Sequence, residues 1–189
     1  MTQRCVRAFI IFGILLVAVG CREVPTTVNV SDGPSFSFQG SGRLASFRVY
    51  GPQPGHKIAT PFDDKSLVWR VQPIEGYFKG THVEGLSVTY GVLPEGYAQT
   101  VPKNAAPNHL TQGQVYYFFA ETTNAPPASG FIYLDGAGPA EIAVPDLCQS
   151  GFLGEVKPLK CGTNEPYTEP ENLEKFVREN RLHKSSPAR

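Results

Sequence analysis

Hydrophobic and polar residues alternate along most of the middle of the chain. One uninterrupted apolar run, Val115 to Ala120, consists of β-branched and aromatic residues between Gly113 and Asn124. Such a run is typical of a packed central β-strand rather than of a helical turn. Shorter period-two patterns bounded by Gly or Pro predict further half-buried strands. They lie at positions 36–38, 45–49, 67–71, 86–90, 131–134 and 141–144. About seven short strands without an intervening helix predict a mainly-β protein, an antiparallel β-sandwich.

The pattern becomes helical near the C-terminus. Thr168-Glu169-Pro170-Glu171 has the form of a capping box, and Leu173, Phe176 and Val177 recur at helical spacing. We therefore expect a C-terminal α-helix from about Glu169 to Leu182. Its narrow apolar stripe favours packing against the sandwich. The alternative is a docking helix that contacts a partner protein through residues such as Phe176.

The first twenty residues predict an export signal. Arg4 and Arg7 precede an apolar stretch at positions 8–20, which is short for a bilayer span because a spanning helix needs about 20 apolar residues. Ala18-Val19-Gly20-Cys21 then resembles the lipobox of bacterial lipoproteins, whose cysteine is lipidated and becomes the new N-terminus. An ordinary secretory signal and an uncleaved anchor are the alternatives.

The lipobox resemblance implies attachment to a membrane through lipid on Cys21, since several acyl chains give stable anchoring. Arg22, rather than Asp, follows the cysteine. By resemblance to lipoproteins of diderm bacteria, this implies an outer-membrane protein that faces the periplasm. Loss of residues 1–20 removes two of the 17 basic residues and none of the 17 acidic ones, leaving a balance of −2. A net charge of −2 gives little attraction to anionic lipid, and it does not indicate nucleic-acid binding.

Two cysteines remain after Cys5, in the signal, and Cys21 are set aside. In an exported protein, Cys148 and Cys161 most simply form a disulfide. A loop of this size would stabilise the fold by about 3 kcal/mol in the chain-entropy model. A redox-active or metal-binding pair is the alternative, but Cys-x-x-Cys spacing and a nearby His are missing.

These features divide the chain into four parts. They are a signal peptide (1–20), a lipidated N-terminus and tether (21–34), the sandwich (35–145), and a C-terminal part (146–189) with the disulfide-closed loop, the helix and a disordered tail. The tether is assigned from the polar composition of positions 22–34. A short edge strand over Thr27 to Val30 is the competing interpretation.

Part of the sandwich resembles fibronectin type III and similar immunoglobulin-like domains. Trp69 matches the core tryptophan of the second strand in that family. Leu110, Gly113 and Tyr116 match its tyrosine corner, in which the hydroxyl bonds back to the main chain. Gln112 stands where the family usually has Pro, and positions 99–109 show no clear fifth strand. The resemblance covers positions 44–135 and implies an immunoglobulin-like architecture without a particular chemistry.

Candidate chemistry is sparse. The sequence contains no Gly-x-Ser-x-Gly, His-Glu-x-x-His or Walker loop. His56, His82 and His109 fall in expected loops, where solvated histidines are a simpler interpretation than a metal site. We therefore predict no catalytic residues, no metal and no cofactor.

Loop aromatics offer a different kind of site. Tyr77, Phe78 and Tyr97 are candidates for an exposed stacking platform that binds glycans or peptides. Alternatively, these rings fold back over the core. The sequence as a whole favours a lipid-anchored envelope protein that acts as an interaction, assembly or inhibitory module on another envelope protein. A glycan- or peptidoglycan-binding module is the alternative, and an envelope enzyme is third.

Overall fold

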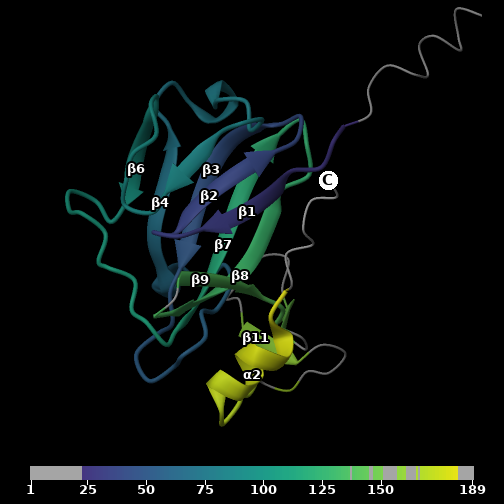
Figure 1. Ribbon diagram of the computed structural model, residues 1–189. Helices are drawn as coiled ribbons and strands as arrows, with labels where there is room; N and C mark the ends of the chain where they lie inside the picture. Colours follow the sequence, from purple (N-terminus) through teal and green to yellow (C-terminus); the bar gives the residue numbers. More distant parts are fainter. Residues whose placement is uncertain are drawn as a thin grey trace, which may run out of the picture.

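Two antiparallel sheets packed face to face form the body of the protein in the computed structural model (Figure 1). The structure describes residues 23–136, 138–144, 147–150, 157–160, 165 and 167–182, and only the main chain of 147–150 and 157–160. The larger sheet has the order β6 (Tyr97–Val101), β4 (Leu67–Pro73), β3 (Arg43–Tyr50), β7 (Val115–Thr123), β8 (Ala128–Asp135) and β9 (Gly138–Ile142). The smaller sheet has the order β1 (Thr27–Ser31), β2 (Ser35–Gln39) and β5 (Ser87–Thr89).

The main core lies between the two sheets and is built from aromatic rings. Phe36 of β2 lies 4.7 Å from Phe47 of β3 and 5.2 Å from Phe118 of β7, measured between ring centroids. Trp69 of β4 packs edge-on against Phe47 at 6.0 Å, and its indole N–H donates to Gln99 of β6. The alternation in β3 and β7 thus points one set of side chains at the smaller sheet, as the period-two pattern predicts.

The run Val115 to Ala120 forms β7, whose apolar side chains cover both faces of the larger sheet. On the outer face, Phe62 covers Tyr117 and Phe119, with ring centroids 5.5 and 4.8 Å apart. The prediction of a packed central strand is therefore confirmed. Further along this face, Ile58, Val115 and Tyr133 form a second apolar cluster with the C-terminal helix.

The mainly-β antiparallel architecture with a C-terminal helix is confirmed, but the strand count is not. The two sheets together hold nine strands rather than about seven, and β10 (Leu147–Ser150) pairs separately with β11 (Lys157–Lys160). Strand β6 spans Tyr97–Val101 and so extends into positions 99–109, in which the sequence shows no clear strand. Locally, the tyrosine-corner hydrogen bond is present, since the Thr111 N–H donates to the Tyr116 hydroxyl at 2.8 Å. This bond alone does not establish an immunoglobulin-like topology.

The chain joins the fold earlier than the tether assignment expects. Val24 and Ser41 exchange hydrogen bonds, Thr26 is buried, and Thr27–Ser31 form β1. The tether interpretation is therefore wrong from Val24 onward, and the competing edge strand is correct. The side chains at positions 27, 29 and 31 are polar and exposed because β1 is an edge strand that buries only alternate residues, which gives this segment the polar composition of a tether.

The C-terminal helix, α2, spans Leu173–Asn180 and begins later than expected. Asn172, rather than Thr168, caps it by accepting a hydrogen bond from the Lys175 N–H at 2.8 Å. Leu173 and Val177 are buried against the outer-face cluster, which confirms that the helix packs on the sandwich. Beyond it, the Leu182 N–H donates to the Glu141 carbonyl, so the chain adds to the outer edge of β9.

Several expectations fall outside the described residues. These residues exclude Cys21 and Cys161, and Cys148 lies on β10 opposite Leu159. The lipid anchor and the disulfide therefore stay predictions. Within the described part of the chain, no helix is long and apolar enough to cross a membrane.

Candidate functional site

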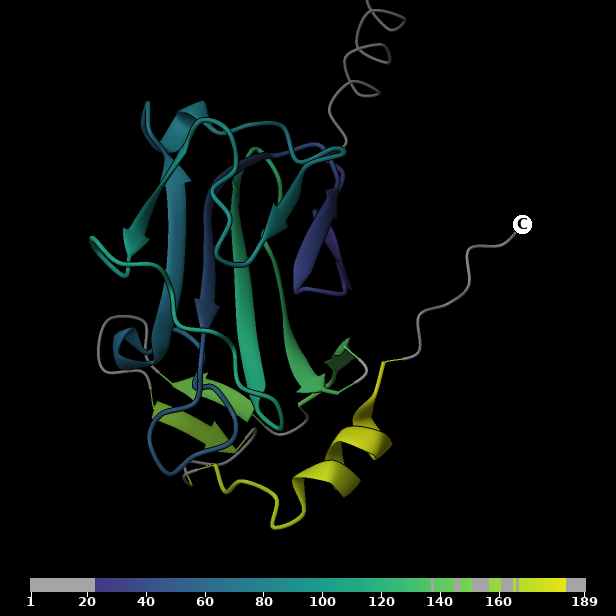
Figure 2. The same cartoon turned by 60° about the vertical axis from the view of Figure 1, so that its left-hand side comes forward.

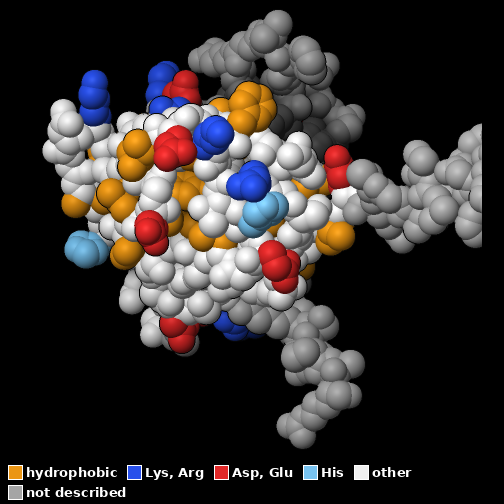
Figure 3. Space-filling model, turned by 90° about the horizontal axis from the view of Figure 1, so that it is seen from above, with side chains coloured by type: hydrophobic (Ala, Val, Ile, Leu, Met, Phe, Trp, Pro, Cys, Tyr) orange, Lys and Arg blue, Asp and Glu red, His pale blue; other side chains and the backbone are white. Residues whose placement is uncertain are grey.

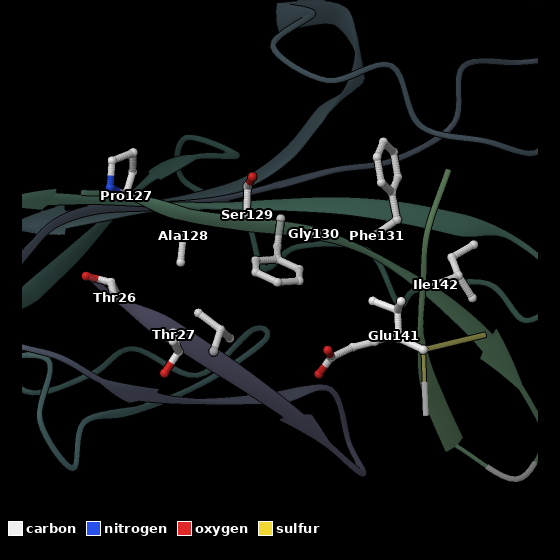
Figure 4. A pocket seen from close by; sticks show the side chains of 12 residues that line it. Thr26, Thr27, Pro127, Ala128, Ser129, Gly130, Phe131, Glu141 and Ile142 are labelled. Atoms are coloured by element: carbon white, nitrogen blue, oxygen red, sulfur yellow. The ribbon is translucent and has the colours of Figure 1, made fainter. Parts of the chain in front are cut away.

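A groove of about 440 Å³ separates β1 from the first half of β8 (Figure 4). It lies at an open side of the sandwich, where the two sheets do not meet. Its walls come from these two strands, and Glu141 of β9 and Leu182 line it as well. The residues most relevant to its chemistry are Thr27, Val28, Phe118, Ser129, Gly130 and Glu141.

The wall formed by β8 is open because β9 is shorter than β8. Their pairing ends at Phe131 opposite Ile142, leaving Ala128 to Gly130 beyond the end of β9. Leu134 exchanges main-chain hydrogen bonds with Gly113 and Gln114, so its main-chain N–H and C=O point toward β7. Because strand residues alternate, Ser129 faces the opposite edge. Its main-chain N–H and C=O therefore point into the groove.

The wall formed by β1 is also an unpaired edge, since β1 pairs only with β2 among the described strands. On its free side, the Thr26 N–H donates to the Pro126 carbonyl at 3.4 Å, and the Val30 N–H donates to Glu141 Oε1 at 3.0 Å. Val28 lies between these two bonds, and because strand residues alternate, its main-chain N–H and C=O point to the same free side. The groove is thus flanked by main-chain donors and acceptors from both sheets.

The floor of the groove is apolar and depends on one glycine. Phe118 is almost fully buried beneath Gly130, and a Cβ atom at this glycine would lie 2.9 Å from two carbons of the Phe118 ring. A side chain at position 130 would therefore fill the floor or displace the ring. Figure 4 shows Phe131 directed away from β1, toward the outer face, whereas the Glu141 side chain reaches toward β1.

Glu141 joins the two sheets at one end of the groove. Its carboxylate accepts the Val30 N–H, and its main-chain carbonyl accepts the Leu182 N–H. A side-chain acceptor here replaces the strand partner that β1 lacks. Together, an apolar floor and polar main-chain edges suit an extended polypeptide segment better than a compact small molecule.

A second candidate surface lies at the end of the sandwich that carries the 3₁₀ turn η2 (Tyr77–Lys79). Tyr77 is 43% exposed and Phe78 is 76% exposed, and their rings meet edge-on at 5.0 Å. The Tyr77 hydroxyl donates to Glu121 at 3.1 Å, and Glu121 in turn pairs with Arg48 at 2.6 Å. Partial burial and the bond to the Glu121 carboxylate raise the pKa of Tyr77.

Two neighbouring segments position this turn. Gly80, directly after η2, lies so close to the Leu44 carbonyl that any Cβ atom would overlap it. Ile74, before the turn, is 69% exposed, and its N–H donates to the Gly96 carbonyl at 3.0 Å. Figure 3 looks down on this end, where hydrophobic side chains lie at the surface among charged ones.

The other predicted contact residues do not join this surface. Tyr97 lies in β6 and is 4% exposed, so the prediction of a loop aromatic available for stacking is wrong for this residue. Its hydroxyl donates to the Leu44 carbonyl at 2.8 Å and accepts from the Thr81 N–H at 3.0 Å. Phe176 is half-buried and packs in the outer-face cluster, at the opposite end of the molecule from η2 (Figure 1).

The structure does not bring the loop histidines together. Among the described residues, no three His, Cys, Asp or Glu side chains are grouped so that they could hold a metal ion. His56 instead lies 3.5 Å from Glu169.

Sequence reasoning missed the groove because Ala128 to Gly130 lie before the strand predicted at positions 131–134, whereas β8 begins at Ala128. A glycine next to an apolar strand pattern was the available signal, since it often marks a close approach of other groups to the main chain. Comparison of the chain with known protein families, with characterised proteins and with solved structures finds no match.

Proposed function

We propose that this protein is a lipid-anchored interaction module of the cell envelope, which takes up an extended segment of another envelope protein in the groove between β1 and β8. The observation that carries the proposal is the pair of open strand edges that face this groove, at Val28 and Ser129. The Cys21 lipobox supports anchoring at the outer membrane, facing the periplasm. The Tyr116 corner supports a distant immunoglobulin-like architecture.

Strand addition is the physical basis of the proposed recognition. An incoming segment satisfies main-chain groups that are otherwise left to water, while its alternate side chains face the apolar floor. Unpaired edges also invite unwanted association, so proteins usually shorten, cover or charge them. Here Glu141 covers one end of β1 and leaves Val28 open, which limits the free edge to a short segment.

Site-specific photo-crosslinking in cells tests the proposal. A photoreactive amino acid replaces Thr27, which is exposed on the groove wall, and a matched control replaces exposed Lys103, which follows β6 at the opposite edge of the larger sheet. One dominant protein adduct from position 27, absent at position 103, would support the proposal. Equal adducts at both positions would contradict it. Release from the membrane by Cys21→Ala should weaken the adduct if anchoring positions the protein.

A pair of substitutions at Ser129 sharpens this test. Ser129→Pro removes the main-chain N–H that faces the groove, while the bonds between β7 and β8 stay intact because they use the neighbouring residues. Ser129→Ala removes the same hydroxyl and keeps the N–H. The adduct from position 27 should be lost with proline and kept with alanine. Equal loss in both variants would argue against main-chain pairing.

A second candidate function rests on a different observation, the exposed edge-on pair Tyr77 and Phe78. Such a platform suits a glycan, because sugar faces stack on aromatic rings. In this case soluble peptidoglycan fragments should bind, and Tyr77→Ala should abolish their binding. Tyr97→Ala is not informative here because that ring is buried.

A further inference from the structure

The end of the sandwich that carries η2 is also the end at which the described chain begins (Figures 1 and 2). Val24 bonds to Ser41, the Val83 N–H donates to the Gly42 carbonyl, and the Leu44 N–H donates to the Thr81 carbonyl. These hydrogen bonds connect the N-terminal residues to the loop that follows η2. Both views place α2 at the opposite end.

This end carries four exposed apolar side chains, which we call the apolar tip: Val24, Ile74, Tyr77 and Phe78. Phe78 at 76% and Ile74 at 69% are the two most exposed large hydrophobic side chains of the described residues. Exposed groups of this kind at one end of a domain mark a contact with a protein or a membrane.

The N-terminal connection decides between these two occupants. Only Arg22 and Glu23 separate Cys21 from Val24, so their α-carbons are three residue steps apart. Even fully extended, these steps span about 10 Å. A lipidated Cys21 would therefore hold Val24 within about 10 Å of the bilayer surface. The side chains at the same end then face the lipid.

We infer that the apolar tip rests in the interfacial layer of the membrane to which Cys21 is anchored, with Phe78 inserted. The inference rests on the lipid anchor of the proposed function. Aromatic rings suit this layer, and Tyr77 combines an apolar ring with a hydroxyl bonded to Glu121. Lys79, Glu75 and Glu84 are exposed nearby and give the tip no excess of positive charge. The contact is therefore apolar and insensitive to salt.

Quenching by brominated lipid tests the inference on the full-length, lipidated protein. Phe78→Trp is reconstituted into vesicles of phosphatidylethanolamine and phosphatidylglycerol, with or without bromine on the acyl chains. Native Trp69 is 0% exposed and supplies a constant background. The new indole at position 78 should emit at a shorter wavelength than an indole in water. In vesicles with brominated acyl chains it should lose roughly half of the intensity that it has in unbrominated vesicles. Leu182→Trp, exposed but remote from the tip, should not be quenched.

Vesicle flotation distinguishes a failure of the lipid anchor from a failure of the membrane contact at the apolar tip. If the protein does not float with the vesicles, the lipid anchor fails and the inference falls with it. If it floats and position 78 is not quenched, the anchor stands and the membrane contact of the tip is overturned. A blue shift without quenching would place a protein or a glycan on the tip, which also overturns the inference. In an Ile74→Trp background, Phe78→Asp should float normally, keep the Trp69 emission and expose the indole at position 74 to aqueous quenchers.

Discussion

The hydroxyl of Tyr97 links three segments of the sandwich, and its removal should have a measurable effect on stability. It donates to the Leu44 carbonyl of β3 and accepts from the Thr81 N–H, which lies just after η2. Tyr97→Phe keeps the ring in the core and deletes both hydrogen bonds. The Leu44 carbonyl is then left in a buried position without this donor. Leaving buried main-chain groups unsatisfied costs about 1–3 kcal/mol, so we expect a loss of about 2 kcal/mol.

Urea unfolding measures this loss directly. Trp69 is the only tryptophan of the chain and is fully buried, so its fluorescence reports the core. In thermal unfolding, a domain of this size should lose about 2–4 °C for each kcal/mol. Tyr133→Phe is the matched control, because Tyr133 is also buried and its ring packs with Ile58 and Val115, away from the η2 loop. Its stability should change by no more than about 0.5 kcal/mol.

The comparison between the two variants can refute the reasoning. If Tyr97→Phe and Tyr133→Phe unfold at the same urea concentration, the hydroxyl of Tyr97 does not hold the η2 loop to β3. If Tyr97→Phe is the less stable variant, hydrogen exchange should also show faster exchange at the Thr81 amide.

Three further predictions concern the groove, the core and the C-terminal segment. Gly130→Val should lower stability by about 1–3 kcal/mol and close the groove, since its side chain meets the Phe118 ring; urea unfolding and the crosslink from position 27 report the two effects. Burial raises the pKa values of Tyr50, Tyr90, Tyr97 and Tyr117 in the folded state above the unfolded value of about 10. The stability that these neutral phenols contribute is therefore fully present below about pH 10 and is lost as the pH rises through the pKa values of the folded state. Phenolate absorbance should then appear together with unfolding, and gradual titration of a folded protein would contradict this. Glu169 accepts hydrogen bonds from the Lys57 and Ile58 amides, so Glu169→Ala should speed hydrogen exchange at these two amides, and an unchanged rate would show that the contact does not hold the loop.

The parts of the fold that could be predicted are those in which burial fixes the side-chain pattern. β7 was predictable because its apolar residues occupy both faces of the sheet, and α2 because Leu173 and Val177 share one buried side. The start of α2 was not predictable, since two capping patterns compete in this segment. Asn172 forms the actual cap, while Glu169 accepts hydrogen bonds from Lys57 and Ile58 instead.

Edge strands carried weaker signals. β6 contains Gln99 and Thr100, whose side chains bond to Trp69 and Arg70, so polar residues stand where a strand pattern expects apolar ones. The sequence signal of the groove was limited to Gly130, because the groove results from the length difference between β8 and β9. Of the predicted site residues, Tyr77 and Phe78 are exposed as expected, whereas Tyr97 is buried because its hydroxyl finds main-chain partners inside.

The bond between Val30 and Glu141 joins residues 111 positions apart in the sequence, and the bond from the Thr26 N–H to the Pro126 carbonyl holds the free side of β1 at its other end. Closing so long a loop costs more chain entropy than forming the hairpin contacts between β1 and β2, so this edge forms late in folding. By the same reasoning, it opens in the native protein at a lower free-energy cost than the paired strands β3 and β7. The groove between β1 and β8 can therefore widen while the aromatic core stays intact, which gives a partner segment a route of entry that does not require unfolding.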